Sequence, residues 1–253
     1  MESKKINHFK IVVPSYNNEK WIRACLRSVK NQKYNNFQCI VIDDCSFDKS
    51  CSIIESEIKD DSRFIFIKNN KKKLALRNIY EAIEESKPNN EDIIATLDGD
   101  DWLIGDHVLQ KLSNVYNQNK CWMTYGSYAE YPLKTRGRFS RQIPDFVIQN
   151  NSYRKSAWMS SHMRTFKYKL WNKIDKKDLL EEDGRFCDGA WDMAFMFPML
   201  EMSGPRGIFI KDMLYVYNRA NPLNEDKVDH RRLLTSESKI RNKTKYKRIE
   251  DDI

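Results

Sequence analysis

Short apolar stretches alternate with amphipathic stretches through the N-terminal part of the chain, and this alternation limits the fold more than any other feature. The apolar stretches have the length of strands, whereas the stretches between them repeat apolar residues at helical spacing. The expected strands span 9–13, 38–43, 63–68 and 92–97. The expected helices span 17–32, 48–58 and 74–85. Such alternation is typical of an α/β domain, in which helices flank a mostly parallel sheet.

Beyond residue 107 the pattern is less regular. Helices are expected at about 106–117, 165–174 and 189–202, strands at 121–125 and 213–217, and a basic loop or lid at 136–151. Pro198 should bend or interrupt the third of these helices. From residue 227 onward the chain is charged and nearly free of aromatic residues, which predicts a basic helix or a mobile tail outside the core. We therefore expect one domain over 1–226, followed by a basic segment over 227–253.

The composition indicates a folded protein and excludes several classes. The 253 residues are 40% hydrophobic and 32% charged, which is too apolar for a disordered chain. The six cysteines include no C-x-x-C pair, which argues against a zinc site or a redox motif. No apolar run has the length of a membrane span or of a signal peptide, so we expect a soluble, cytoplasmic protein. The net charge of +8 favours an anionic partner: a nucleotide, nucleic acid or a membrane surface.

Polar clusters follow three of the expected strands, at the edge of the sheet where ligands of such folds bind. They are Ser15-Tyr16-Asn17, Asp43-Asp44 and Asp98-Gly99-Asp100-Asp101. In the last cluster, each pair of carboxylates at about 4 Å costs roughly 4 kcal/mol at an effective dielectric constant of about 20. Either a divalent cation such as Mg²⁺ lies between them, or they splay into water around a turn at Gly99. These residues alone leave both interpretations open.

Four short motifs lie at the expected strand ends or on a helix between them. In chain order they are Val12-Val13-Pro14-Ser15-Tyr16-Asn17, Val41-Ile42-Asp43-Asp44-Cys45-Ser46-Phe47-Asp48, Arg77-Asn78 and Leu97-Asp98-Gly99-Asp100-Asp101-Trp102. Their order and spacing resemble the nucleotide-binding half of family 2 glycosyltransferases, which have the GT-A fold and use sugar nucleotides. The resemblance implies a GT-A, Rossmann-like domain with a nucleotide-binding half at about 9–107. An irregular acceptor-side half at about 108–226 would follow, over which the resemblance extends more weakly to about Asn221.

The resemblance implies a UDP-sugar donor site built from strand-end residues. Tyr16 would stack its ring on the nucleobase, a contact worth about 1–3 kcal/mol in comparable sites. Asp44, rather than Asp43, would accept the imino N–H of uracil, because a carboxylate is only an acceptor. Arg77 offers a fork of donors for a phosphate or an aspartate. The other expected contacts with the nucleotide or the donor sugar come from Pro14, Asn17, Asp98, Gly99, Trp158 and His162.

Each of these residues also has a structural interpretation. Tyr16 could cover the core at a strand end, Asp44 could cap a helix or a turn, and Arg77 could be an exposed helical arginine. A lone histidine such as His162 is more often structural than a ligand. His162 and His230 are both candidates for contact with a metal or a phosphate.

The family's acidic motif, the DXD motif, holds Mn²⁺ or Mg²⁺ and the donor ribose. Carried over to this sequence, Asp100 is the expected direct metal ligand, Asp98 lies toward the ribose and the metal, and Asp101 supports them. The metal would bind the pyrophosphate and neutralise the charge that grows on the UDP leaving group, acting as a Lewis acid worth several kcal/mol.

Gly189-Ala190-Trp191-Asp192 resembles the family segment that ends in the catalytic aspartate. The family usually has Glu or Gly before that aspartate, where this chain has Trp191, and Asp188 is therefore a rival. An aspartate of ordinary pKa is ionised at about pH 7 and could take the proton of an acceptor hydroxyl, which contributes roughly 10²–10⁴-fold. The structural alternative for Asp192 is an acid in the first turn of a helix, where the dipole favours it.

These motifs predict an inverting, metal-dependent glycosyltransferase of the hexosyltransferase type, active in glycan biosynthesis. It would move a sugar from a UDP-sugar to a hydroxyl of a glycan, protein or lipid-linked acceptor. A nucleotidyltransferase that forms sugar nucleotides is an alternative, but it should carry a Gly-rich, basic signature at 14–17. A non-catalytic basic module for nucleotides or nucleic acid is another, based on the +8 charge. Because the basic residues lie mainly outside the motifs, we expect no nucleic-acid partner, and the basic C-terminus is a candidate for peripheral membrane contact.

Overall fold

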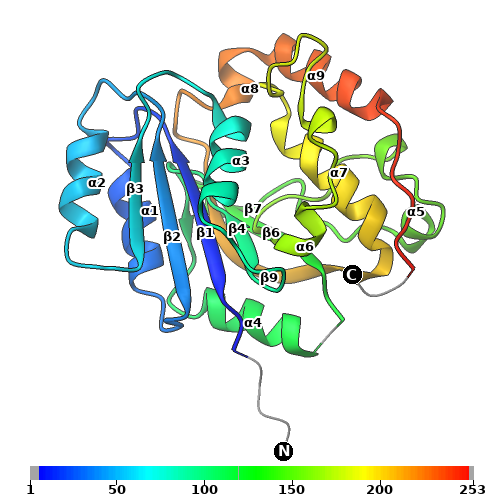
Figure 1. Ribbon diagram of the computed structural model, residues 1–253, viewed down its shortest axis with the longest axis horizontal. Helices are drawn as coiled ribbons and strands as arrows, with labels where there is room; N and C mark the ends of the chain where they lie inside the picture. The colour runs from blue at the N-terminus through cyan, green and yellow to red at the C-terminus, as the bar shows by residue number, and fades with distance from the viewer. Residues whose placement is uncertain (1–5, 119, 251–253) are drawn as a thin grey trace, which may run out of the picture.

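The computed structural model describes residues 6–118 and 120–250. Within these residues the strands form a single nine-stranded sheet in the order β3-β2-β1-β4-β8-β6-β9-β5, with β7 paired to β6 (Figure 1). The strands are β1 Phe9–Ser15, β2 Phe37–Asp43, β3 Phe64–Lys68, β4 Ile93–Thr96, β5 Trp102–Leu103, β6 Met123–Tyr131, β7 Thr135–Arg136, β8 Arg164–Lys167 and β9 Gly207–Asn218. Strands β3, β2, β1 and β4 are parallel to one another, so the predicted α/β class with a mostly parallel sheet on this side is confirmed.

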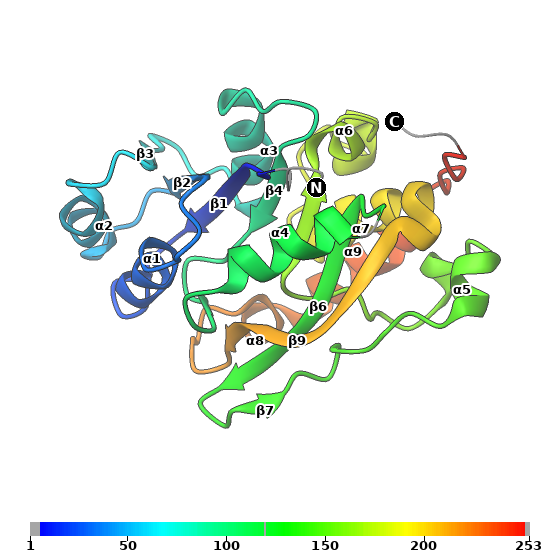
Figure 2. The same ribbon diagram turned by 90° about the horizontal axis from the view of Figure 1, so that it is seen from below.

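Helices cover both faces of the sheet, which Figure 2 shows from below. They are α1 Ile22–Lys30, α2 Ser50–Ile58, α3 Ala75–Glu85, α4 Val108–Gln118, α5 Asp145–Gln149, α6 Tyr168–Trp171, α7 Trp191–Ser203, α8 Glu225–Val228 and α9 His230–Asn242. Successive side chains of β1 point to opposite faces. Ile11 and Val13 therefore pack in the same core as Leu26 of α1, whereas Val12 packs in the other core with Ile79 of α3. No helix in the described ranges is both long enough and apolar enough to cross a membrane.

The C-terminal half of the sheet is mixed, and its pairing brings distant segments to the acidic motif. Strand β8 runs antiparallel to β4 and to β6, and β6 runs parallel to β9. The short strand β5, which follows the acidic motif directly, is antiparallel to β9, with Trp102 opposite Val216 and Leu103 opposite Tyr215. This pairing fixes the end of β9 beside the three aspartates.

Two expected elements differ from the structure. The segment 165–174, expected as a helix, contributes to β8 and then to the short α6, because Thr165 and Phe166 are fully buried within the sheet. The helix expected at 189–202 is α7, and Pro198 lies inside it without ending it. Almost all of α7 is buried, and this packing outweighs the roughly 3 kcal/mol that an interior proline costs a helix.

Of the basic segment expected as a helix or a mobile tail, residues 230–242 form the helix α9, and the described residues of this segment contact the core. Arg154 and Glu201 form a buried ion pair, with Nε 2.6 Å from Oε1. Arg154 Nη1 also donates to the carbonyl oxygen of Ile240 at 2.7 Å, and Glu201 Oε2 accepts the backbone N–H of Tyr246 at 2.9 Å. A buried ion pair needs such additional partners to be stable, so the C-terminal segment is part of the core. A domain boundary at 226 stays a prediction.

Candidate active site

The carboxyl ends of β1, β2 and β4 open onto a cavity of about 300 Å³, which we call the first cavity. It brings together most of the predicted site residues: Pro14, Tyr16, Asp44, Asp98, Gly99, Asp100, His162 and Asp192. The position agrees with the rule that ligands bind outside the carboxyl ends of parallel strands. Polar clusters that are far apart in the sequence therefore face one space.

Three predicted residues lie elsewhere. Arg77 is half exposed on α3, where its Nε lies 2.7 Å from Glu81 Oε1, and it does not line the first cavity. Asn17 uses its side-chain oxygen to accept the backbone N–H of Phe47 at 3.1 Å. Trp158 packs edge-on against Phe197 and lines a neighbouring cavity. Their contacts with a nucleotide or sugar stay predictions.

Gly99 allows the loops after β1 and β4 to approach closely. A Cβ atom at this position would lie 2.9 Å from Ser15 Cβ and 3.0 Å from the Pro14 carbonyl oxygen. The backbone N–H of Gly99 donates to that same carbonyl at 3.0 Å. The glycine is therefore required for space, and it places Asp98 and Asp100 on either side of the contact.

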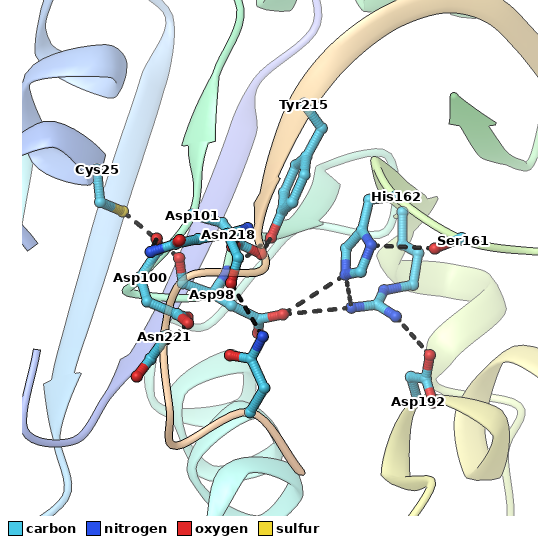
Figure 3. Close-up of polar contacts among 12 residues, drawn as sticks. Cys25, Asp98, Asp100, Asp101, Ser161, His162, Asp192, Tyr215, Asn218 and Asn221 are labelled. Atoms are coloured by element: carbon cyan, nitrogen blue, oxygen red, sulfur yellow. Dashed lines mark hydrogen bonds and ion pairs between the residues drawn. The ribbon is translucent and has the colours of Figure 1, made fainter. Parts of the chain in front are cut away.

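The three acidic side chains have different surroundings, as Figure 3 shows. Asp101 is buried: its Oδ2 accepts from the Tyr215 hydroxyl at 2.6 Å and its Oδ1 from the Asn218 N–H at 2.7 Å. Asp100 Oδ2 accepts from Asn221 Nδ2 at 2.7 Å. The Asp98 carboxylate lies instead beside two nitrogen-bearing side chains, one from the loop before β8 and one from the first residue of β8.

Those two side chains are His162 and Arg164. His162 Nε2 lies 3.5 Å and Arg164 Nη2 lies 3.7 Å from Asp98 Oδ2. Arg164 Nη2 is also 2.7 Å from His162 Nε2, and because arginine only donates, this nitrogen of a neutral His162 accepts. The proton of the ring then lies on Nδ1, 3.0 Å from Ser161 Oγ. The ring stacks on Tyr215, with centroids 4.4 Å apart.

Burial and like charge set the protonation of this group. Burial, followed by the charge of Asp98, raises the pKa of Asp100 to about 6. Burial, with Asp100 and Asp98 nearby, raises the pKa of Asp101 well above its usual range. Burial also opposes ionisation of Asp98, but His162 and Arg164 hold its pKa below the ordinary value. Burial and Arg164 lower the pKa of His162, which keeps the imidazole neutral.

The residues present fit a divalent cation. Ligand atoms of Asp98, Asp101 and His162 lie within 4.8 Å of one another, and Asp100 lies between the two aspartates in sequence. Carboxylate oxygens suit Mg²⁺ and Mn²⁺, and a cation would relieve the repulsion that raises the pKa of Asp100 and Asp101. The assignment of Asp100 as the direct ligand stays a prediction, because the close group contains Asp101 and His162 in its place.

Asp44 and Tyr16 form the opposite wall of the first cavity. Asp44 accepts backbone N–H groups of Lys73 and Leu74, each at 2.8 Å, and the Asn69 amide at 2.9 Å. Burial opposes ionisation of Asp44, but these hydrogen bonds hold its pKa below the ordinary value. The Asn78 side chain also contributes a hydrogen bond to Asp44, and the contact of Asp44 with a nucleobase N–H stays a prediction. Lys72 Nζ lies 3.5 Å from the centroid of the Tyr16 ring and therefore covers one face of that ring.

Asp192, at the start of α7, faces the acidic motif across the first cavity. Its Oδ2 accepts from Arg164 Nη1 at 2.6 Å, and its Oδ1 accepts the backbone N–H of Met193 at 3.0 Å. Arg164 is 1% exposed and therefore links Asp192 to Asp98 through one buried guanidinium. Asp188 lies 3.5 Å from Arg232 and lines a separate surface depression. Of the two rivals, Asp192 is the one that lines the first cavity.

A second cavity, of about 450 Å³, adjoins the first. Four residues line both cavities and form the boundary between them: His162, Asp192, Tyr217 and Glu225. Trp158 and His230 line only the second, on the side away from the acidic motif. These four residues come from the loop before β8, from α7, from β9 and from α8.

Sequence reasoning missed several residues that build this site. They are Tyr215, Tyr217, Asn218, Asn221 and Glu225. The pair Asn218 and Asn221, which follows the apolar stretch 213–217, was a signal of a polar strand end comparable to those after β1 and β4.

Comparison with known proteins identifies the family. Residues 10–178 match the family described as Glycosyl transferase family 2. The chain belongs to this family. An uncharacterized glycosyltransferase of Haemophilus influenzae is 39% identical over 121 residues, which are 47% of this chain and 46% of that protein. The chain spans about half the length of the first curated relatives that it matches.

Solved structures of glycosyltransferases share the fold. The S. aureus TarS 1–349 complex with UDP-GlcNAc has a TM-score of 0.61 at 15% identity, over 84% of this chain and 58% of that one. The mannosyltransferase PcManGT from Pyrobaculum calidifontis, in complex with GDP-Man and Mn²⁺, has a TM-score of 0.60 at 15% identity, over 94% and 66%. The predicted GT-A fold and the predicted family are confirmed.

Proposed function

We propose that this protein transfers a sugar from a UDP-sugar to a hydroxyl of an acceptor, with inversion at the anomeric carbon and with a divalent cation bound. One observation carries the proposal. The acidic motif, which follows β4, and Asp192, in the first turn of α7, line one cavity and are joined by the buried Arg164. This is the arrangement that a single displacement needs, with a diphosphate on one side and a base on the other.

The donor half of the reaction is assigned to residues at the strand ends. Tyr16 is the proposed stacking partner of the base, and Asp44 is the proposed acceptor of an imino N–H. Asp98 and Gly99 lie where the ribose and the diphosphate would follow. The TarS complex with UDP-GlcNAc supports a UDP-sugar, since that protein shares the fold.

The cation would be held by Asp98 and Asp100, with Asp101 and His162 within reach. Bound Mg²⁺ or Mn²⁺ supplies charge neutralisation on the departing diphosphate. Asp101 is assigned a supporting role beside the cation site, because both of its carboxylate oxygens already accept hydrogen bonds, one from Tyr215 and one from Asn218. The Mn²⁺ complex of PcManGT supports this part of the proposal.

The acceptor half is assigned to the boundary between the two cavities. A hydroxyl entering from the second cavity meets Asp192, which is held by Arg164 and can accept the proton as the oxygen attacks. The second cavity is the proposed acceptor site, and its acceptor is a glycan, a protein or a lipid-linked sugar. Contact of the basic C-terminus with a membrane surface stays a prediction.

A screen of UDP-sugars with Mn²⁺ present and absent tests the proposal. The expected result is UDP release from at least one donor that requires the cation, with slow hydrolysis when no acceptor is added. UDP binding without release from any donor would indicate a non-catalytic nucleotide-binding protein. The absence of UDP binding would refute the donor assignment.

A further inference from the structure

Glu225, the first residue of α8, lies on the boundary between the two cavities beside Asp192. It belongs to neither the acidic motif nor the segment 189–192, and it is brought there by the chain that follows β9. Its carboxyl group is a hydrogen-bond acceptor for the backbone N–H of Ala190, two residues before Asp192. Glu225 is therefore held by the backbone just before Asp192, and both acids line the same two cavities.

The two carboxyl groups differ in their partners. Both oxygens of Asp192 accept hydrogen bonds, one of them from the Arg164 guanidinium. Glu225 Oε1 is buried and has no hydrogen-bond partner among the described residues. An unpaired buried acceptor costs about 1–3 kcal/mol, and such a cost is compensated when a ligand supplies the missing donor. A hydroxyl group of an acceptor is a donor of the required kind.

The charges around Glu225 favour its protonated form. Burial, followed by Asp192, raises the pKa of Glu225 to about 8; Asp188 acts in the same direction, and Arg232 opposes them. A carboxylate whose pKa lies near neutrality is a stronger base than one of ordinary pKa. Asp192 lies against a fixed positive charge, which makes it less suited to keep a proton.

We propose, on the basis of the proposed function, that Glu225 is a second catalytic residue and that the proton of the acceptor hydroxyl comes to rest on it. As the acceptor oxygen forms its bond to the anomeric carbon, the bond from that carbon to the diphosphate oxygen breaks, and its electron pair leaves with the diphosphate. The O–H bond of the acceptor breaks, and the proton passes to Asp192 and from Asp192 to the Glu225 carboxylate, since both acids line the same two cavities. Asp192, held by Arg164, accepts a hydrogen bond from the hydroxyl and positions it.

The test compares Glu225→Gln with Asp192→Asn in release of UDP from the donor that the wild type uses, from about pH 6 to about pH 9. Wild-type turnover should rise with pH and level off above about pH 8, where Glu225 is ionised. Glu225→Gln should lose this rise and turn over roughly 10²-fold more slowly at the plateau, with unchanged affinity for UDP. Glu225→Asp should keep the rise at a reduced rate. Asp192→Asn should be slow but keep a rise, shifted to lower pH because the charge of Asp192 raises the pKa of Glu225.

Glu55→Gln is the matched control, because Glu55 is exposed and pairs with Lys68 far from both cavities. The proposal is overturned if Glu225→Gln keeps the pH dependence of the wild type, or if it slows turnover equally at every pH, which would indicate a structural role. Failure of the proposed function is a different result: the wild type itself would then bind no UDP or release none from any UDP-sugar.

Discussion

The two halves of the sheet build their parts of the site in different ways. Around β1, β2 and β4 the backbone alone places the polar side chains, because each follows directly from a buried parallel strand. From β6 onward the side chains come from β8, β9 and the starts of α7 and α8, and they are held at the cavity by contacts with one another. Arg164 needs Asp98 and Asp192, and Asp101 needs Tyr215 and Asn218. The first arrangement depends on strand register and the second on buried polar pairs, so mutations should affect them differently.

The largest effect on stability is expected in the C-terminal half, from Glu201→Ala. It leaves the buried Arg154 unpaired and removes the acceptor of the Tyr246 N–H. Loss of one partner of a buried ion pair costs about 3–5 kcal/mol, or a fall in Tm of roughly 6–20 °C. The exposed pair of Lys68 and Glu55 is the control from the other half, and Glu55→Ala should cost about 0–1 kcal/mol. Thermal unfolding measures both, and equal effects would remove the distinction between the halves.

The largest effect on turnover is expected from Asp192→Asn. We expect a loss of about 10²-fold or more, since a positioned carboxylate is removed while the shape is kept. UDP affinity should be unchanged, because the nucleotide is assigned to the other half. Asp188→Asn, which alters the rival acid outside the first cavity, should have little effect on steady-state turnover. If Asp188→Asn lost more turnover than Asp192→Asn, Asp188 would be the base.

Gly99→Ala tests whether close approach of two backbones holds the donor half together. The added Cβ would lie 2.9 Å from Ser15 Cβ and 3.0 Å from the Pro14 carbonyl, neither of which can yield freely. We expect a loss of about 1–3 kcal/mol in unfolding free energy by denaturant titration, together with weaker UDP binding. An unchanged stability would mean that the loops after β1 and β4 can separate without cost.

Asp100→Ala sharpens the metal assignment within the acidic motif. We expect UDP affinity measured by calorimetry in Mn²⁺ to fall by at least about 10-fold, with affinity in chelator unchanged. Asp101→Asn is the comparison, because asparagine has the size and shape of aspartate but carries no negative charge. If Asp100→Ala binds UDP normally with Mn²⁺ while Asp101→Asn does not, the group of Asp98, Asp101 and His162 holds the cation instead.

Glu225 should also make the stability of the folded protein depend on pH. Its pKa in the folded state, about 8, lies above the unfolded value, so its stabilising contribution is complete at low pH and is lost as the pH rises through that value. Glu225→Gln mimics the protonated form. The variant should match the wild type near about pH 5 and have the higher Tm above about pH 8. A constant difference in Tm across this range would show that Glu225 is not protonated in the folded protein.

Much of the N-terminal half could be predicted from the sequence. Apolar runs such as Ile11–Val13 define buried strands, and the residue after each run must lie at the carboxyl edge of the sheet, which is how Tyr16, Asp44 and Asp98 were found. Arg77, in contrast, does not line the first cavity but pairs with its i,i+4 neighbour Glu81 on the surface of α3, and its contact with a phosphate stays a prediction. A motif predicts which residue is involved, whereas the orientation of the helix about its own axis decides whether that residue faces the cavity or the solvent.

The C-terminal segment shows where such prediction ends. Its composition, basic and nearly free of aromatic residues, indicated a tail, yet Ile240 is buried and the backbone of 240–246 completes the Arg154 and Glu201 pair. A backbone carbonyl has no sequence signature as a partner of a buried charge. The same limit applies to Glu225, which composition would place on the surface.

The sequence by itself determined the family, the parallel strands and the presence of three carboxylates after β4, because short apolar strands and Gly99 encode local geometry. Only the tertiary structure decided which groups pair with each charged side chain. Asp98 meets His162 and Arg164, Asp101 meets Tyr215, and Asp192 meets Arg164, although these residues are far apart in the sequence and follow no periodic pattern. The physical reason is that buried charges are stabilised by whichever partners the folded chain brings within a few ångströms, and those partners come from strands that pair only in three dimensions.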